Sequence, residues 1–319
     1  MQGLITQGYT VLPFSSDPLQ HSQRFRGCLR TMPDLPFTEP PYAIGGFSAL
    51  GNAGSFHHTV IRAMRAEVHE AFAAPLKAAF PDKQIQMGID RITYRPVGKA
   101  PSREGWHRDL TPVNMCLDND IILGGWVNMN ATESQFLVCV PGTHTTVSNH
   151  TQGLGFSKLT TQQIANINNN NRGQKIEIPA GYALLFDQRL IHCVNSTKYR
   201  HPVMRMHISF RLTTSEVPLL ENIREILERG AVPPLKSGQM PPMFPKLYAV
   251  NHQHLLIQES ERFAECMKED RFLAGNCLTR RGIEHREYRI LKQNCPSLQE
   301  MGMVFEPYTE QEINMFFSH

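Results

Sequence analysis

The sequence feature that most restricts the fold is a series of short apolar segments, each closed by glycine or proline, within residues 84–212. Residues 84–97 alternate apolar and polar side chains, and two further apolar runs follow at 121–130 and 136–140. Alternation at every second residue is typical of β-strands, and glycine and proline mark turns. The series predicts a sandwich or closed jelly roll rather than alternating β-α units.

Four more predicted strands complete this block. They cover residues 175–178, 182–186, 190–192 and 203–212. Because successive side chains of a strand point to opposite sides, the last strand presents a set of polar residues on one face. These residues are Arg205, His207, Ser209 and Arg211.

The segments before and between the strands carry other patterns. Residues 1–57 are rich in proline, glycine and serine, and we expect only one strand there, at residues 9–12. Apolar residues recur at helical spacing from Thr59 to Phe80, which predicts a helix. The asparagine-rich residues 160–174 predict an exposed loop.

The pattern changes to a helical one after residue 215. We expect helices at residues 218–229, 255–274 and 309–317, the last one beginning with a capping box of Thr309 and Glu312. We therefore divide the chain into a mainly β domain, residues 1–215, and a mostly helical C-terminal extension, residues 216–319.

Composition excludes several classes of protein. The chain has 319 residues and a net charge of +3, too small to indicate a nucleic-acid or membrane surface. Seven scattered cysteines without a C-x-x-C pair indicate neither a disulfide framework nor a zinc knuckle, and no signal peptide or membrane-spanning run is present. We expect a soluble protein in the reducing cytoplasm.

The segment from His107 to Asn114 admits two chemical interpretations. His107-Arg108-Asp109-Leu110 with Asn114 reproduces the H-R-D-L-x-x-x-N catalytic loop of protein kinases. Phosphoryl transfer also needs a glycine-rich loop, a strand lysine and a second aspartate for magnesium. The sequence has no G-x-G-x-x-G-x-V motif before this loop and no D-F-G or A-P-E after it. We therefore reject a kinase.

The other interpretation is an iron site with two histidines and one carboxylate. On a strand, His107 and Asp109 point to the same side and can bind one metal ion. His192, at the end of an apolar strand, is the predicted second imidazole. We expect His144 and His150 to be exposed and His207 to line a core or cavity.

An iron ion held by three protein ligands keeps positions open for 2-oxoglutarate and dioxygen. The far carboxylate of 2-oxoglutarate favours a guanidinium partner, because the planar fork of arginine pairs with it bidentately. Arg205 is the first candidate for this role, and Arg211 on the same strand face is the second.

Several motifs across residues 85–212 resemble the phytanoyl-CoA dioxygenase-like branch of the iron(II)/2-oxoglutarate oxygenases. They are Trp106-His107-Arg108-Asp109, Gly125-Trp126-Val127-Asn128, the segment from Phe136 to His144, Ala180 to Phe186, Leu190-Ile191-His192 and Arg205. The resemblance implies a double-stranded β-helix (cupin-like jelly roll) with flanking helices. It further implies iron bound by His107, Asp109 and His192, with 2-oxoglutarate held by Arg205 and its pocket lined by Trp126. Tyr182 and Cys193 depart from the family pattern.

The resemblance implies an enzyme that hydroxylates or oxidatively demethylates its substrate, with release of succinate and CO2. Asp109 favours hydroxylation over halogenation, because related halogenases have a small residue there. We expect a small-molecule substrate, while a nucleic-acid or protein substrate and the oligomeric state stay open. The alternative is a cupin-like protein that binds a metal or acidic ligand without turnover.

Overall fold

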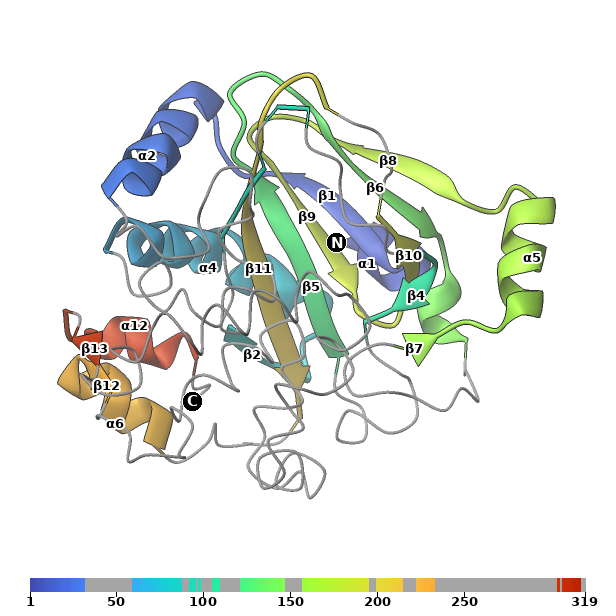
Figure 1. The fold of residues 1–319 in the computed structure, drawn as a ribbon. Helices are drawn as coiled ribbons and strands as arrows, with labels where there is room; N and C mark the ends of the chain where they lie inside the picture. The colour runs from blue at the N-terminus through green and yellow to red at the C-terminus, as the bar shows by residue number, and fades with distance from the viewer. Residues whose placement is uncertain are drawn as a thin grey trace, which may run out of the picture.

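The computed structural model describes eleven stretches of the chain. These are residues 1–31, 59–87, 92–95, 97–98, 105–109, 121–146, 157–194, 199–214, 222–232, 303–304 and 306–316. Two antiparallel sheets lie against each other, and helices cover the outer face of the larger sheet (Figure 1).

The larger sheet has the strand order β1-β9-β5-β11-β2, with β3 also paired to β11. Its strands are β1 (Tyr9–Pro13), β2 (Gln84–Met87), β3 (Ile92–Arg95), β5 (Ile121–Asn128), β9 (Tyr182–Asp187) and β11 (Val203–Thr213). β11 is the longest of them and pairs with β5 from Arg205 to Leu212.

The smaller sheet has the order β7-β4-β10-β6-β8. Its strands are β4 (His107–Arg108), β6 (Gln135–Val140), β7 (Ser157–Lys158), β8 (Gln174–Ile178) and β10 (Ile191–Cys193). From β4 to β11 the chain passes repeatedly between the two sheets. This is the double-stranded β-helix that the sequence predicts, and the mainly β fold class is confirmed.

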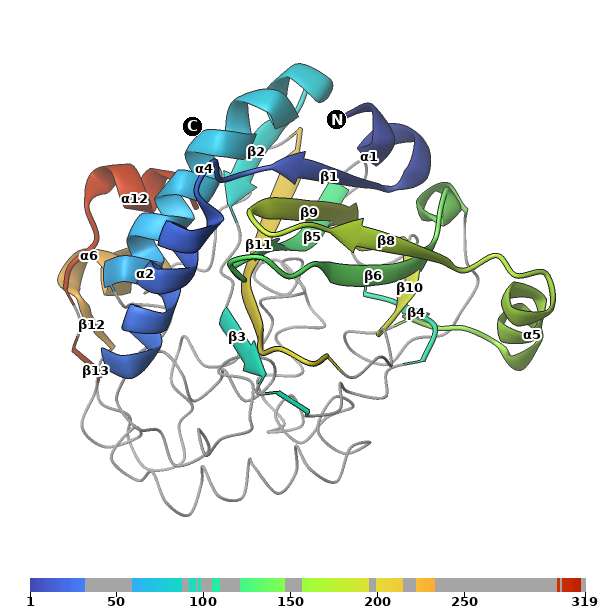
Figure 2. The same cartoon turned by 90° about the horizontal axis from the view of Figure 1, so that it is seen from above.

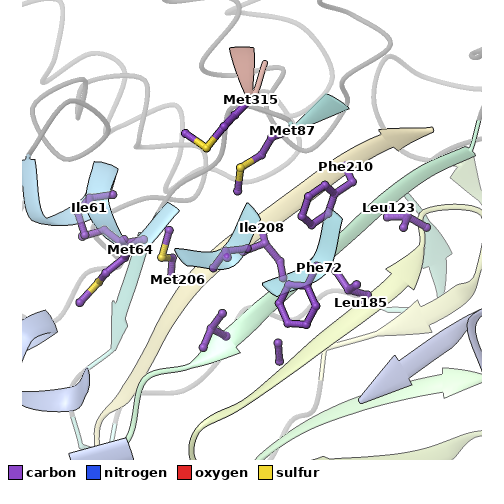
Figure 3. Close-up of a cluster of buried hydrophobic side chains, with 14 of the residues drawn as sticks. Ile61, Met64, Phe72, Met87, Leu123, Leu185, Met206, Ile208, Phe210 and Met315 are labelled. Carbon is purple, nitrogen blue, oxygen red and sulfur yellow. The ribbon is translucent and has the colours of Figure 1, made fainter. Parts of the chain in front are cut away.

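The main hydrophobic core lies between the larger sheet and the helix α4 (Thr59–Ala79). Alternate residues of β11, such as Ile208 and Phe210, pack with Phe72 of α4 and Met87 of β2 (Figure 3). Figure 2 shows α4 and α2 (Pro18–Thr31) on one side of this sheet and the smaller sheet on the other. The remaining residues of β11 therefore face the space between the sheets.

Three helices lie where the sequence did not predict a helix. α1 (Gln2–Gln7) and α2 occupy a region where we expected one strand, and only β1 was foreseen. The asparagine-rich stretch forms α5 (Thr161–Asn169), capped by Thr160, instead of a loop. Its Ile167 is buried against β10, so packing of a few apolar residues outweighs the polar composition.

The predicted helix from Thr59 is confirmed as α4, although Pro75 lies inside it. Of the C-terminal part, the structure describes α6 (Asn222–Arg229), the pair β12 (Ala231–Val232) and β13 (Met303–Val304), and α12 (Glu310–Asn314). The capping box of Thr309 and Glu312 is present as predicted. The expected helix at residues 255–274 lies outside the described residues.

The last described residues are bound to the core through Arg62 of α4. Its guanidinium donates to Glu312 at 2.8 and 2.5 Å and to the carbonyl oxygens of Glu306 and Pro307. It also stacks over the ring of Tyr308 at 3.9 Å, and Phe316 is fully buried. Residues 306–316 are therefore part of the same core as α4. No helix in the described stretches is both long and apolar enough to span a membrane.

We expect the Arg62–Glu312 pair to make the free energy of unfolding depend on pH in the acidic range. Burial raises the pKa of Glu312, but the hydrogen bonds from Arg62 and Thr309 outweigh it, so the pKa falls below the ordinary 4.5. A lowered carboxyl pKa adds stability above the unfolded-state pKa, and this stability is lost as pH falls through the folded-state pKa. Glu312→Gln should cost about 2–4 kcal/mol at neutral pH, since it leaves Arg62 buried without its charged partner.

Thermal or urea unfolding between neutral pH and about pH 3 measures this effect, because ordinary carboxyl groups titrate near pH 4. The wild type should lose stability as the pH falls below 4.5, and the variant should show a flatter profile there. The control is Glu310→Gln, whose exposed pair with Arg224 at 2.7 Å should contribute little. Equal losses in the two variants would contradict the buried-pair argument.

Candidate metal centre

Two histidines and an aspartate meet where β4 and β10 pair. His107 and His192 are direct cross-strand partners, and Asp109 follows two residues after His107. The Oδ1 atom of Asp109 lies 3.3 Å from Nε2 of His107 and 3.6 Å from Nε2 of His192. One ligand atom from each of the three residues lies within 4.8 Å of the other two. This arrangement suits one metal ion bound by two imidazoles and a carboxylate.

The backbone fixes the tautomers of both histidines. Nδ1 of His107 lies 2.8 Å from the carbonyl oxygen of Gly105, and Nδ1 of His192 lies 2.9 Å from that of Leu190. A carbonyl oxygen only accepts, so each neutral ring carries its proton on Nδ1 and a lone pair on Nε2. Two lone pairs and the Asp109 carboxylate thus converge on one point. The two lone pairs and the carboxylate repel one another unless a cation lies between them.

The site is almost closed to water. His107 and His192 are each 8% exposed, and the ring of Phe186 packs 5.0 Å from the ring of His192. Burial raises the pKa of the Cys139 thiol to about 12 and that of the Cys193 thiol to about 11. Both thiols beside His192 are therefore protonated at neutral pH. The residues whose ligand atoms converge are His107, Asp109 and His192.

Arg108, between the two β4 ligands in sequence, points away from them. Its guanidinium donates to the carbonyl oxygens of Thr143 and Arg189 and to the hydroxyl of Thr146. Burial lowers the pKa of Arg108 to about 10, so the group stays charged at neutral pH. The Thr143 hydroxyl in turn accepts from the backbone N–H of Ile191 at 3.0 Å. Arg108 thus joins β4 to the turn that follows β6 and to the turn that precedes β10.

His144 is buried, so the prediction that it is exposed was wrong. It lies in the short helix η2 (Thr143–Thr145), and its Nε2 donates to the carbonyl oxygen of Ile5 at 3.0 Å. No pattern in the sequence indicated α1, against which this turn packs. Gly8 has φ of 83°, and a Cβ there would meet Nδ1 of His144 at 2.6 Å. His150 lies outside the described residues.

Arg205, the predicted anchor for 2-oxoglutarate, lies between the sheets on the same side as Trp126. Its guanidinium stacks over the Trp126 ring at 4.0 Å, and its Nε donates to Gln135 Oε1 at 2.8 Å. Gln135 is itself held by donating to Asn128 and Asn130 at 2.7 and 2.8 Å. The sequence did not point to Gln135, because an isolated glutamine in an apolar strand carries no motif. Its burial at 0% exposure marks it in the structure.

The larger sheet can be divided into rows of residues that lie directly opposite each other on neighbouring strands. The rows that face the smaller sheet are Arg205 with Asn128, His207 with Trp126, Ser209 with Gly124 and Phe186, and Arg211 with Ile122 and Gln86. His207 also bonds Thr93 Oγ1 at 2.9 Å, so it lines the interior as predicted.

Two contacts show where the metal ligands lie along these rows. Gln135 in β6 contacts the Arg205 row, and His192 contacts Phe186 of the Ser209 row. β4 and β6 are both antiparallel to β10, so they run in the same direction. Because β6 begins with Gln135 beside Arg205, β4 also runs from the Arg205 end toward the Arg211 end. Asp109 therefore lies further toward Arg211 than His107 does. Arg205 lies two rows from the Ser209 row, which is level with His192, and Arg211 lies one row from it on the side toward Asp109.

The family model described as Phytanoyl-CoA dioxygenase (PhyH) matches residues 19–197, more than half of the chain, and the match ends before Arg205. No curated protein sequence matches the chain.

Similar solved structures include EctD from S. alaskensis with bound Fe, which is 16% identical, covers 66% of this chain and 74% of its own, and has a TM-score of 0.44. AviO1 from Streptomyces viridochromogenes Tue57 is 14% identical over 66% of this chain and 91% of its own, with a TM-score of 0.43. EvdO2 from Micromonospora carbonacea var. aurantiaca complexed with 2-oxoglutarate is 13% identical over 66% and 89%, with a TM-score of 0.44.

We expect Arg108→Gln to weaken metal retention without removing a metal ligand. The variant loses the donors that join β4 to Thr143 and Arg189. The position of His107 relative to His192 is then less well fixed. Loss of groups that orient metal ligands typically costs 10–100-fold in affinity, and we expect about that loss for Fe(II) or Mn(II) by anaerobic titration. The control is Arg189→Gln, whose side chain pairs with Asp187 at 2.5 Å. Unchanged affinity in Arg108→Gln would contradict a supporting role.

Proposed function

The chain belongs to the phytanoyl-CoA dioxygenase family, and from this premise we propose that it hydroxylates or oxidatively demethylates a small-molecule substrate, with release of succinate and CO2. The family makes the chain an enzyme of the iron(II)- and 2-oxoglutarate-dependent oxygenases, with iron, 2-oxoglutarate and dioxygen as the cofactors predicted from the sequence. The substrate and the choice between hydroxylation and demethylation are part of the proposal.

The observation that carries the proposal is the convergence of three electron-pair donors on one point. In our proposal His107, Asp109 and His192 hold the iron, because their Nε2 and Oδ1 atoms lie within 4.8 Å of one another. Three protein ligands leave coordination positions for other groups, which suits oxygenase chemistry better than a closed structural site. Iron with 2-oxoglutarate and dioxygen supplies the oxidation of a C–H bond, and the protein supplies position and surroundings.

Arg205 and Trp126 are the proposed residues for 2-oxoglutarate. The guanidinium of Arg205 is oriented by Gln135 and by the Trp126 ring, so little side-chain entropy is lost when a carboxylate binds. Trp126 Nε1 is a buried donor without a partner within the described residues, and it suits an acceptor such as a carboxylate oxygen. Both groups lie on the interior face of the larger sheet. Arg205 is two rows from Ser209, and Trp126 is one row from it.

We expect His107→Ala and Asp109→Ala each to abolish succinate formation from 2-oxoglutarate under iron and ascorbate, because two remaining ligands cannot hold the metal in place. Iron content of the purified variants is the second measurement. The controls are His21→Ala, which removes a histidine paired with Glu67 at 3.1 Å on another part of the surface, and Asp17→Ala. Full succinate formation by either site variant would refute the ligand assignment.

We expect Arg205→Gln to raise the KM for 2-oxoglutarate on the order of 100-fold, since a buried charged hydrogen-bond partner typically contributes 2–5 kcal/mol. Gln135→Leu should raise it less, about 10-fold, because Arg205 keeps its charge but loses its orientation. Anaerobic binding of 2-oxoglutarate to the Mn(II)-loaded protein separates affinity from turnover. If neither variant changes this affinity, the cosubstrate lies elsewhere.

The alternative function is a cupin-like protein that holds a metal and an acidic ligand without turnover. Wild-type protein that binds Mn(II) and 2-oxoglutarate but never forms succinate, with or without added small molecules, would favour this alternative.

A further inference from the structure

Besides Trp126 Nε1, three polar atoms on the interior face have no hydrogen-bond partner within the described part of the chain. They are the carbonyl oxygens Oε1 of Gln86 and Gln188 and the hydroxyl Oγ of Ser209. These residues are 3%, 1% and 1% exposed, respectively. A buried polar atom without a partner destabilises a fold, so three of them together indicate a place that a ligand fills.

These atoms lie in one region, next to Arg211. Gln86 and Arg211 are direct cross-strand partners, and Ser209 occupies the adjoining row. The Gln188 amide covers Gly124 in that row, since a Cβ on Gly124 would meet Gln188 Nε2 at 3.5 Å. Figure 3 shows Ile208 and Phe210 directed toward α4, which leaves the residues between and after them facing the interior.

This region lies toward the same end of β11 as Asp109, away from Arg205. Phe186, in the Ser209 row, contacts His192, so His192 lies at the height of that row. Strand β4 runs toward the Arg211 row, and Asp109 is the residue that follows β4. A cosubstrate that reaches from Arg205 to the metal would therefore approach from one side. The groups around Arg211 lie at the other end of this face of β11, so they are placed to bind a second ligand.

We propose that Gln86, Gln188, Ser209 and Arg211, called here the Arg211 group, form the substrate subsite, and that the substrate is a small molecule with a carboxylate and at least one O–H or N–H donor. This proposal rests on the proposed oxygenase function. It also gives Arg211, the second predicted anchor for 2-oxoglutarate, a different role.

The chemistry of the group determines this class of substrate. The guanidinium of Arg211 is permanently charged and 2% exposed, and its planar fork matches a carboxylate. The two amide oxygens accept hydrogen bonds, so they favour ligand O–H or N–H groups. A long apolar acyl chain would offer no donor to the two amide oxygens or to the Ser209 hydroxyl. Amino acids and hydroxy acids carry both kinds of group.

The test uses the iron-loaded full chain with 2-oxoglutarate and a panel of common L-amino acids and 2-hydroxy acids, each beside its neutral carboxamide. The measurements are succinate formation above the substrate-free rate and product gain of one oxygen atom. We expect at least one acid to stimulate succinate formation, with kcat/KM at least tenfold above that of its amide. If no acid is preferred over its amide, the proposal is wrong.

Arg211→Gln should remove the preference for the acid over the amide, and Arg211→Lys should retain part of it because the charge remains. The control is Arg200→Gln, an exposed arginine whose loss should leave the preference intact. Retention of the full preference in Arg211→Gln would overturn the assignment.

Ser209→Ala gives a second test that does not depend on the folding of an arginine variant. Because Ser209 Oγ has no partner in the described structure, its removal should leave the melting temperature equal or higher, while the KM for the acid rises several-fold. A lower melting temperature with an unchanged KM would make Ser209 a structural residue and contradict the proposal.

Substrate-free succinate formation by the wild type distinguishes a failure of the substrate subsite from a failure of the oxygenase function. If the wild type forms succinate but shows no preference for acids, the oxygenase function stands and the substrate subsite fails. If it forms no succinate under any condition, the proposed function itself fails.

Discussion

The register between β4 and β10 is the constraint on which the rest of the site depends. His107 and His192 face each other across these strands, and Asp109 follows on the same side. A shift of one residue would turn His107 outward and place the charged Arg108 between the sheets. The contacts of Arg108 with Thr143 and Arg189 oppose that shift, because these acceptors lie on the outer side of β4. The two-residue strand β4 can hold a precise register because its second residue, Arg108, donates to three acceptors.

The space between the sheets is unusual in that many of its residues are polar. One face of β11 supplies apolar residues to the core with α4, and the other face supplies residues such as Arg205, Ser209 and Arg211. Burying such groups costs free energy that the α4 core has to offset. The core does so with a long helix, the larger sheet and residues 306–316 bound through Arg62. The polar interior thus depends on helices that do not touch the metal ligands.

Much of this arrangement could be predicted from the sequence, because strand alternation and the H-x-D spacing are local patterns. The strands, α4, the shared face of β11 and the capping box of Thr309 are of this kind. What the sequence did not reveal depends on contacts between distant segments. α1 and α5 have little helical pattern of their own, and His144 is buried only because α1 covers it. Gln86, Gln135 and Gln188 became visible only when their neighbours and burial were known.

Two arginines on one face of one strand look equivalent in a sequence, but their surroundings differ. Arg205 contacts an aromatic ring and an oriented glutamine, so its fork is held in one plane before any ligand binds. Arg211 lies beside amide and hydroxyl oxygens, three of which lack partners in the described residues. The first setting favours a fixed, planar acid, which is the same for every turnover. The second favours a ligand that brings several polar groups at once. Since Arg205 and Arg211 lie on either side of the Ser209 row, which is level with His192, the same strand can separate cosubstrate recognition from substrate recognition.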